Sequence, residues 1–173
     1  IINQRMNKLL KNTDKSIKRL ISHLEGSGWT IIINDAIVES SKCSPKDRVI
    51  TINETVPINI LWTMLHEAGH SIIFGLDDYC ESFGEIAKQH NWNTTRQTKL
   101  YHYQKLKEEM LAWETGLNLA KSLNIDVDHH EYDEYASSFF MNYVYRSSQM
   151  FYQKHVQIIC DRAGVDIDFG LIS

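Results

Sequence analysis

The strongest pattern in the chain covers residues 57–75 and reads PINILWTMLHEAGHSIIFG. Its apolar residues recur every three or four positions, which is the spacing of one buried helix face. They are Ile58, Leu61, Met64, Leu65, Ala68, Ile72 and Ile73. Pro57 suits the first turn of a helix, and Gly75 can end one. The pattern therefore predicts an amphipathic helix from Pro57 to about Phe74.

The middle of this helix carries an H-E-x-x-H motif at residues 66–70. His66 and His70 are four positions apart, so both face the same side of a helix and can reach one zinc ion. Glu67 sits one step round, where a carboxylate can take a proton from the water on a catalytic zinc. The motif thus predicts a Zn²⁺ site with Glu67 as general base. The competing interpretation is two histidines satisfied in a core beside an incidental glutamate.

A catalytic zinc needs a third protein ligand and one position left for water. The side chains available for this role are Glu108, Glu109, Glu114, His90, His102, His129 and His130. We rank Glu109 first, because Ala112 and Gly116 follow it on the same helix face and would let that helix approach the motif closely. Glu108, Glu114 and His90 remain the alternatives. Position 73 is Ile, so the H-E-x-x-H-x-x-G pattern with a histidine third ligand fails.

The segments before the motif predict a helix over residues 3–24 and then a small sheet. Residues 29–33 and 48–53 are rich in β-branched side chains and read as strands, and residues 36–38 could form another. Residues 40–47 contain Pro45 and read as a loop. We expect two or three short strands in an antiparallel sheet.

Downstream, residues 95–123 predict one long helix, and residues 130–163 one long or two shorter helices. The order favours an α+β fold: a mostly helical, zincin-like single domain spanning residues 1–173, with the small sheet before the active-site helix. We expect a core over about residues 29–123, flanked by the N-terminal helix and by a C-terminal helical extension over residues 124–173.

Three features together resemble the small gluzincins, in particular the ImmA/IrrE-type metallopeptidases of bacteria and phages. They are the strand at 48–53, the Leu65–His70 motif, and Glu109 followed by Ala112. The resemblance covers roughly residues 29–123. It implies peptide-bond hydrolysis, with His66, His70 and Glu109 as zinc ligands, Glu67 as base, and the strand at 48–53 as a sheet edge that pairs with substrate.

The chain departs from that family at two places within the resemblance. Glu109 follows His70 by 39 positions, a long gap, and Trp113 stands where the family often has Asn. An oxyanion partner for the reaction would be a tyrosine or histidine. The residues that could serve are Tyr101, Tyr103, Tyr132, Tyr135 and His102. Glu114 could act as a hydrogen-bond acceptor behind the zinc-ligating histidines.

Two other functions fit the same motif. One is an SprT-like protease with His90 as third ligand and a link to nucleic acid. The other is a non-catalytic, regulatory zincin-fold protein that binds through the basic N-terminal helix or the aromatic C-terminal one. The acidic residues 126–134 suggest a second metal site or, more simply, acidic side chains at a helix start. The aromatic residues between 139 and 152 suggest core or a homodimer face, ahead of a base-stacking surface.

Net charge and cysteine usage indicate which partners and which cellular compartment to expect. The chain has 173 residues and a net charge of −4, which gives no general reason to expect nucleic acid or a membrane surface. Three scattered cysteines indicate a reducing compartment, and no apolar stretch is long enough for a membrane span. We therefore expect a cytoplasmic protein that acts on a protein or peptide substrate.

Overall fold

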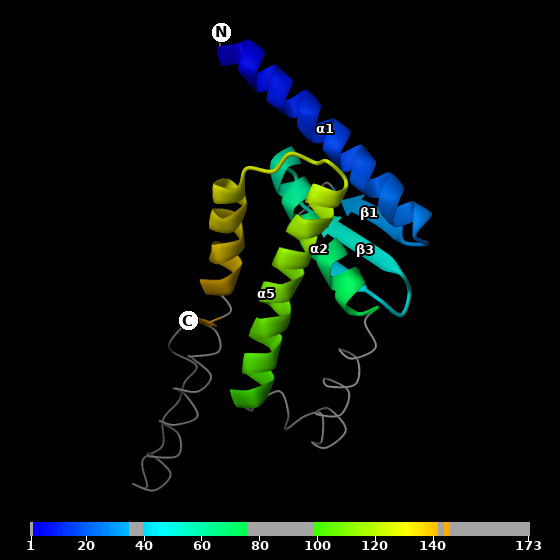
Figure 1. Ribbon diagram of the computed structural model, residues 1–173, viewed down its shortest axis with the longest axis vertical. Helices are drawn as coiled ribbons and strands as arrows, with labels where there is room; N and C mark the ends of the chain where they lie inside the picture. The colour runs from blue at the N-terminus through cyan, green and yellow to red at the C-terminus, as the bar shows by residue number, and fades with distance from the viewer. Residues whose placement is uncertain (1, 35–39, 76–98, 142–143, 146–173) are drawn as a thin grey trace, which may run out of the picture.

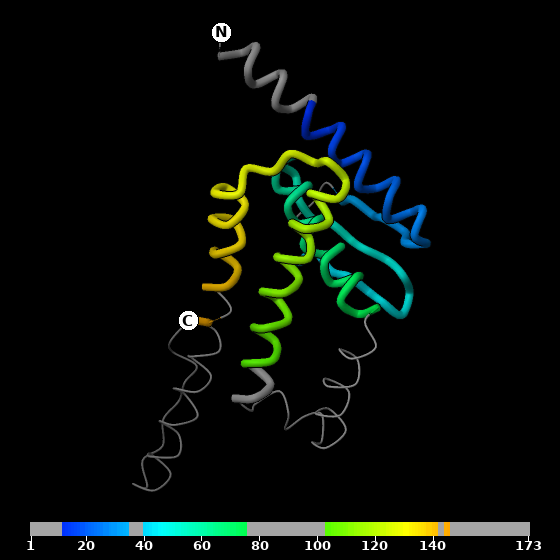
Figure 2. The backbone as a smooth tube through the Cα atoms, viewed as in Figure 1, coloured from blue at the N-terminus to red at the C-terminus, as the bar shows by residue number. Residues whose placement is uncertain are grey.

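The computed structural model describes residues 2–34, 40–75, 99–141 and 144–145 (Figures 1 and 2). Its elements are α1 (Ile2–Gly26), β1 (Thr30–Asn34), β2 (Lys42–Ser44), β3 (Val49–Asn53), α2 (Pro57–Ile73) and α5 (Lys99–Ser122). A further helix covers residues 129–141. The α+β class is confirmed, as is a small sheet before the helix that carries the motif. The strand predicted at 36–38 and the helix beyond residue 145 lie outside the described residues.

The sheet has the strand order β1-β3-β2 and is mixed. β3 pairs in parallel with β1 and antiparallel with β2. Two predictions were therefore wrong: the sheet is not antiparallel throughout, and residues 40–47 are not all loop. β2 is only three residues long and polar, so it shows no periodicity and is held by main-chain pairing to β3. The turn at residues 45–48 joins β2 to β3, which leaves the parallel side of β3 to β1.

The central place of β3 corrects the role that the resemblance implied for residues 48–53. A strand paired on both sides has no free edge for a substrate. Within the described sheet the outer strands are β1 and β2, and of these two β2 lines the cleft around the motif. The difference arises because strand order is a long-range property, which the alternation of residues 48–53 does not contain.

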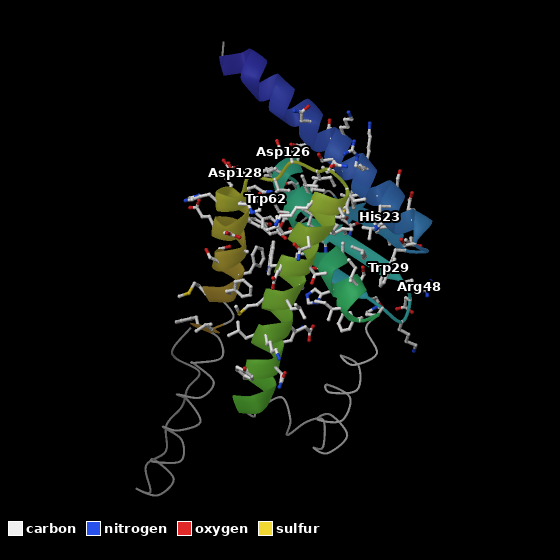
Figure 3. All side chains as sticks on the ribbon, in the orientation of Figure 1. His23, Trp29, Arg48, Trp62, Asp126 and Asp128 are labelled. Carbon is white, nitrogen blue, oxygen red and sulfur yellow. The ribbon has the colours of Figure 1, made fainter. Side chains whose placement is uncertain are left out.

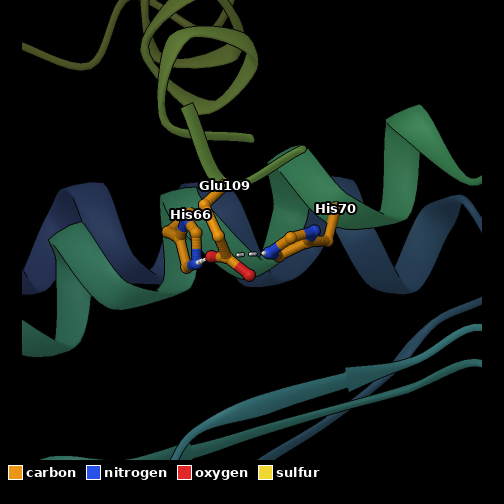
Figure 4. Close-up of side chains that lie close together, drawn as sticks. All are labelled: His66, His70 and Glu109. Atoms are coloured by element: carbon orange, nitrogen blue, oxygen red, sulfur yellow. Dashed lines mark ion pairs between the residues drawn. The ribbon is translucent and has the colours of Figure 1, made fainter. Parts of the chain in front are cut away.

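α2 occupies the middle of the fold, between the sheet and α5 (Figures 1 and 4). It contacts α5 on one side, β2 and β3 on the other, and also α1. Ten consecutive residues, from Leu61 to His70, are buried, since neighbours cover the helix on both sides. The predicted span of this helix agrees with its observed bounds, Pro57–Ile73.

Two glycines allow α2 and α5 to touch through their backbones. A Cβ atom at Gly69 would collide with the carbonyl of Ala112, and one at Gly116 would collide with the carbonyl of Leu65. The expectation that small residues bring these two helices together is confirmed. Because α2 carries the histidines and α5 carries Glu109, this close contact fixes the distance between them.

The remaining elements complete one core around α2. Leu20 and Leu24 of α1 are buried in the same cluster as Trp113 of α5 and Tyr132 of the helix over 129–141. Arg19 donates hydrogen bonds to the carbonyls of Leu123 and Asn124 and so caps the C-terminal end of α5. The division into a core and two extensions stays a prediction.

None of the described helices has the length and apolarity to cross a membrane.

Candidate metal centre

His66, His70 and Glu109 converge on one point (Figure 4). Oε2 of Glu109 lies 3.2 Å from Nε2 of His66 and 3.4 Å from Nε2 of His70. Ligand atoms around a tetrahedral zinc with bonds of about 2.0–2.1 Å are about 3.3–3.4 Å apart. The two distances from Glu109 agree with that edge length. The three side chains therefore form a group that could hold a metal ion, and each offers one donor atom of a type that zinc binds.

Glu109 is oriented by its neighbours on α5. Nζ of Lys105, one helical turn earlier, lies 2.9 Å from Oε1 of Glu109 and 2.8 Å from Oε1 of Glu108. The ammonium group thus holds one oxygen of Glu109 and turns the other toward the histidines. Burial alone would raise the pKa of Glu109, but hydrogen bonds from His66 and His70 and the charge of Lys105 hold it far below its ordinary value. The carboxylate is therefore ionised, as a metal ligand must be.

Aromatic rings fix the two imidazoles. Trp113 stacks on His66 with ring centroids 4.3 Å apart, and Phe74 stacks on His70 at 5.8 Å. Burial is the main cause that lowers the pKa of His66, so its neutral, metal-binding form is favoured. Nδ1 of each histidine is buried without a hydrogen-bond partner in the described part of the chain. The Nε2 atoms are the ones that face Glu109.

Glu108 is the carboxylate behind the site. Its side chain is 3% exposed, and its Oε1 lies 3.5 Å from Nδ1 of His70. That separation is too long for a good hydrogen bond, yet it places the negative charge beside the ring. Glu114, which we had considered for this supporting role, is exposed on α5 and does not line the cleft around the site. Glu108 rather than Glu114 is therefore the carboxylate that lies beside His70.

Glu67 lies in the same cleft, deeply buried. Its side chain accepts a hydrogen bond from the backbone N–H of Cys43 in β2. Burial raises the pKa of Glu67 to about 7, with the charge of Glu109 adding to the effect and His70, Lys105 and the Cys43 N–H opposing it. A carboxylate with a pKa near neutrality can both accept and release a proton, which is what a general base needs.

The cleft around these groups has a volume of about 630 Å³. The segment Ser40–Cys43 forms one wall, while Lys105, Glu109 and Trp113 of α5 form the other. Burial raises the pKa of the Cys43 thiol to about 12, so it stays protonated beside Glu67. Sequence reasoning missed Lys105 and β2. The i,i+4 spacing of Lys105 and Glu109 could have revealed the first, whereas β2 gives no comparable signal.

The structure does not bring every candidate to the centre. His129 and His130 are exposed, and His90 and the side chain of His102 lie outside the described residues. Asp128 accepts hydrogen bonds from the backbone N–H groups of His130 and Glu131, so it caps the next helix (Figure 3). This agrees with the simpler interpretation of residues 126–134. Among the described residues, His66, His70 and Glu109 form the group that could hold a metal ion.

The tyrosines considered as oxyanion partners differ in their exposure and in their hydrogen-bond partners. Tyr103 is 62% exposed, whereas Tyr132 is buried and donates a hydrogen bond to the carbonyl of Trp113. Tyr135 donates to Oε1 of Glu54 and also contacts the hydroxyl of Thr63. The side chain of Tyr101 is outside the described part. Among the tyrosines whose side chains are described, Tyr135 is the one with hydrogen bonds to side chains that line the cleft.

Comparisons with known proteins return no match, whether to a protein-family profile, a curated protein or a solved structure. The motif and its geometry therefore carry the functional argument.

Replacing Glu67 by Gln should stabilise the metal-free protein at alkaline pH. A folded-state pKa raised from 4.5 to about 7 means that the folded chain binds this proton more tightly than the unfolded chain. The stability from this group is complete below the ordinary pKa and is lost as pH rises through about 7. We expect the variant to gain about 2–3 kcal/mol near pH 8 and much less near pH 5. Urea unfolding at both pH values measures the difference; an equal gain at both would contradict a buried, titrating Glu67.

Proposed function

We propose that this protein is a zinc-dependent peptidase of the gluzincin type, similar to the small ImmA/IrrE-like enzymes. One observation carries the proposal: a carboxylate oxygen of Glu109 lies at tetrahedral-edge distance from the Nε2 atoms of His66 and His70, beside a buried glutamate of raised pKa. His66, His70 and Glu109 would hold the ion. The H-E-x-x-H motif and the donor set, two imidazoles and a carboxylate, favour zinc over a harder cation.

In this mechanism each residue has a separate task. A bound zinc would supply Lewis acidity, which lowers the pKa of water and polarises the scissile carbonyl. Glu67 takes a proton from the attacking water and delivers it to the leaving amine. The N–H of Cys43 holds the Glu67 carboxylate in place through this transfer, and Lys105 keeps Glu109 charged.

The edge of β2 is the proposed binding site for the substrate backbone. An extended peptide can add a strand to an exposed sheet edge, and β2 lines the cleft beside Glu67. The Cys43 N–H points to Glu67, away from β3, and in an antiparallel ladder the carbonyl of the same residue points the same way. That carbonyl can accept a hydrogen bond from a substrate N–H. This role replaces the one first expected for β3.

Hydrolysis should depend on metal and on Glu109. We expect the zinc-loaded protein to cleave members of a mixed fluorogenic peptide library. Chelation should abolish the activity, and added Zn²⁺ should restore it. Glu109→Ala should need far more zinc for the same rate, because one of three ligands is gone. Cleavage that survives chelation would contradict the proposal, and a zinc-loaded chain that cleaves nothing would point to a non-catalytic binding protein.

A further inference from the structure

One end of the cleft is lined by aromatic side chains that extend beyond His66, His70 and Glu109. Trp113, which stacks on His66, also contacts Tyr135 and Phe139 with ring centroids 6.0 Å and 5.8 Å apart. Tyr135 and Phe139 lie 5.1 Å apart. Phe139 lines the cleft and is 46% exposed. An aromatic wall therefore leads away from the metal-binding histidine and ends in an accessible ring.

Glu54 adjoins this aromatic wall at Tyr135. It follows β3 directly, lines the cleft and is partly buried. Its Oε1 accepts a hydrogen bond of 3.0 Å from the Tyr135 hydroxyl. Thr63 lies 3.0 Å from the same hydroxyl, and because that hydroxyl donates to Glu54, Thr63 acts as its donor. The position of Glu54 is thus fixed from the aromatic wall and from α2.

The backbone before Glu54 is fixed as well. Asn53 is buried, and its side-chain oxygen accepts a hydrogen bond from Asn34 of β1. Its side-chain amide donates to the carbonyl of Ser40, and its backbone N–H donates to Ser41 Oγ. Both serines line the cleft. The carboxylate of Glu54 is consequently presented by a rigid segment, as a recognition group should be.

The ion pairs given among the described residues of the cleft do not include Glu54. The carboxylates that line it are Glu54, Glu67, Glu108 and Glu109, and the cations are Lys42 and Lys105. Lys105 binds both Glu108 and Glu109. The bonded neighbour of Glu54 is instead a neutral hydroxyl. A fixed carboxylate near an accessible aromatic ring attracts a cation through its charge and through the ring face.

We propose that Glu54, with Phe139 and Trp113, forms a subsite for an arginine or lysine side chain of the substrate, close to the scissile bond. This inference rests on the proposed peptidase function and specifies its substrate class. Thr63 precedes His66 by three residues, about one helical turn or roughly 5 Å. Neighbouring residues of an extended peptide are about 3.8 Å apart at their Cα atoms, so a long basic side chain beside the cleaved bond can reach Glu54.

Binding tests the subsite without requiring turnover. Short Ala/Gly/Ser peptides carry a single central arginine or, as the neutral isostere, citrulline. Calorimetry measures their affinity for the zinc-loaded Glu67→Gln protein. We expect the arginine peptide to bind about tenfold more tightly, and a Glu54→Gln change in the same background to reduce the ratio to about one. The amide oxygen of the introduced glutamine can still accept the Tyr135 hydrogen bond, so the fold should persist. Glu134→Gln, an exposed change on the helix that carries Phe139, should leave the ratio unaltered.

The outcomes separate the inference from the peptidase proposal. Phe139→Ala removes a partly exposed ring at little risk to folding and should also reduce the arginine preference. A preference that Glu54→Gln abolishes supports the subsite, even if the wild-type chain cleaves no peptide and the peptidase function fails. Equal binding of the two peptides, or a preference that Glu54→Gln leaves intact, would overturn the subsite even if the protein proves to be an active peptidase.

Discussion

Replacing Gly69 by alanine should destabilise the protein by about 3–5 kcal/mol, although alanine is the better helix former. The new Cβ atom would collide with the Ala112 carbonyl, which is backbone and cannot turn away as a side chain could. α2 and α5 would have to separate, opening the core and moving Glu109 away from the histidines. Urea unfolding of the metal-free protein measures the loss, and zinc titration of the folded fraction should show a weakened site.

Gly26→Ala is the matched control for this change. Gly26 is the last residue of α1, and a Cβ atom there meets nothing within 4 Å. The same substitution should therefore be neutral or stabilise by up to about 1 kcal/mol. If Gly69→Ala is as stable as Gly26→Ala, α2 and α5 do not touch through their backbones as described. The distances from Glu109 to His66 and His70 would then be wrong as well.

Replacing Glu67 by Gln should reduce kcat/KM for peptide hydrolysis by about 10²–10⁴-fold while zinc stays bound. Glutamine preserves the shape of the side chain and can accept the Cys43 hydrogen bond, but it cannot take a proton from water. The proposed metal ligands His66, His70 and Glu109 are unchanged. Initial rates on the best library peptide give the loss in activity, and zinc content measured on the same sample shows whether the site is still filled.

Glu131→Gln provides a control for this loss, because Glu131 is exposed outside the cleft. It should keep the wild-type rate. A Glu67→Gln protein that hydrolyses peptides at the wild-type rate would exclude Glu67 as the base. Loss of both zinc and activity would instead mean that Glu67 is needed for zinc binding, which would contradict its proposed role as general base alone.

The parts of the site that could be predicted from sequence are those with a local cause. His66 and His70 share a helix face because they are four residues apart, and no tertiary information is needed to infer that. Glu109 could be ranked above Glu108 because Ala112 and Gly116 mark the face of α5 that approaches α2. That placement agrees with the backbone contacts of Gly69 and Gly116.

The parts that could not be predicted depend on contacts distant in sequence. β2 has three residues and no alternation, so only its pairing with β3 reveals it. The central place of β3 follows from strand order, which is set by how the whole sheet packs on α2. The role of Cys43 in holding Glu67 follows from the same packing. The resemblance thus implied a substrate-binding edge on β3, which is paired on both sides, whereas the group of His66, His70 and Glu109 could be anticipated.

The zinc content of the protein tests the central claim most directly. The chain is stripped with a chelator, reloaded with Zn²⁺, dialysed and analysed by elemental mass spectrometry, together with His66→Ala and Glu109→Ala. The account predicts about one zinc per wild-type chain and a large loss in both variants, because a three-ligand site does not tolerate removal of a ligand. A wild-type chain that retains no zinc, or variants that retain as much as wild type, would contradict it.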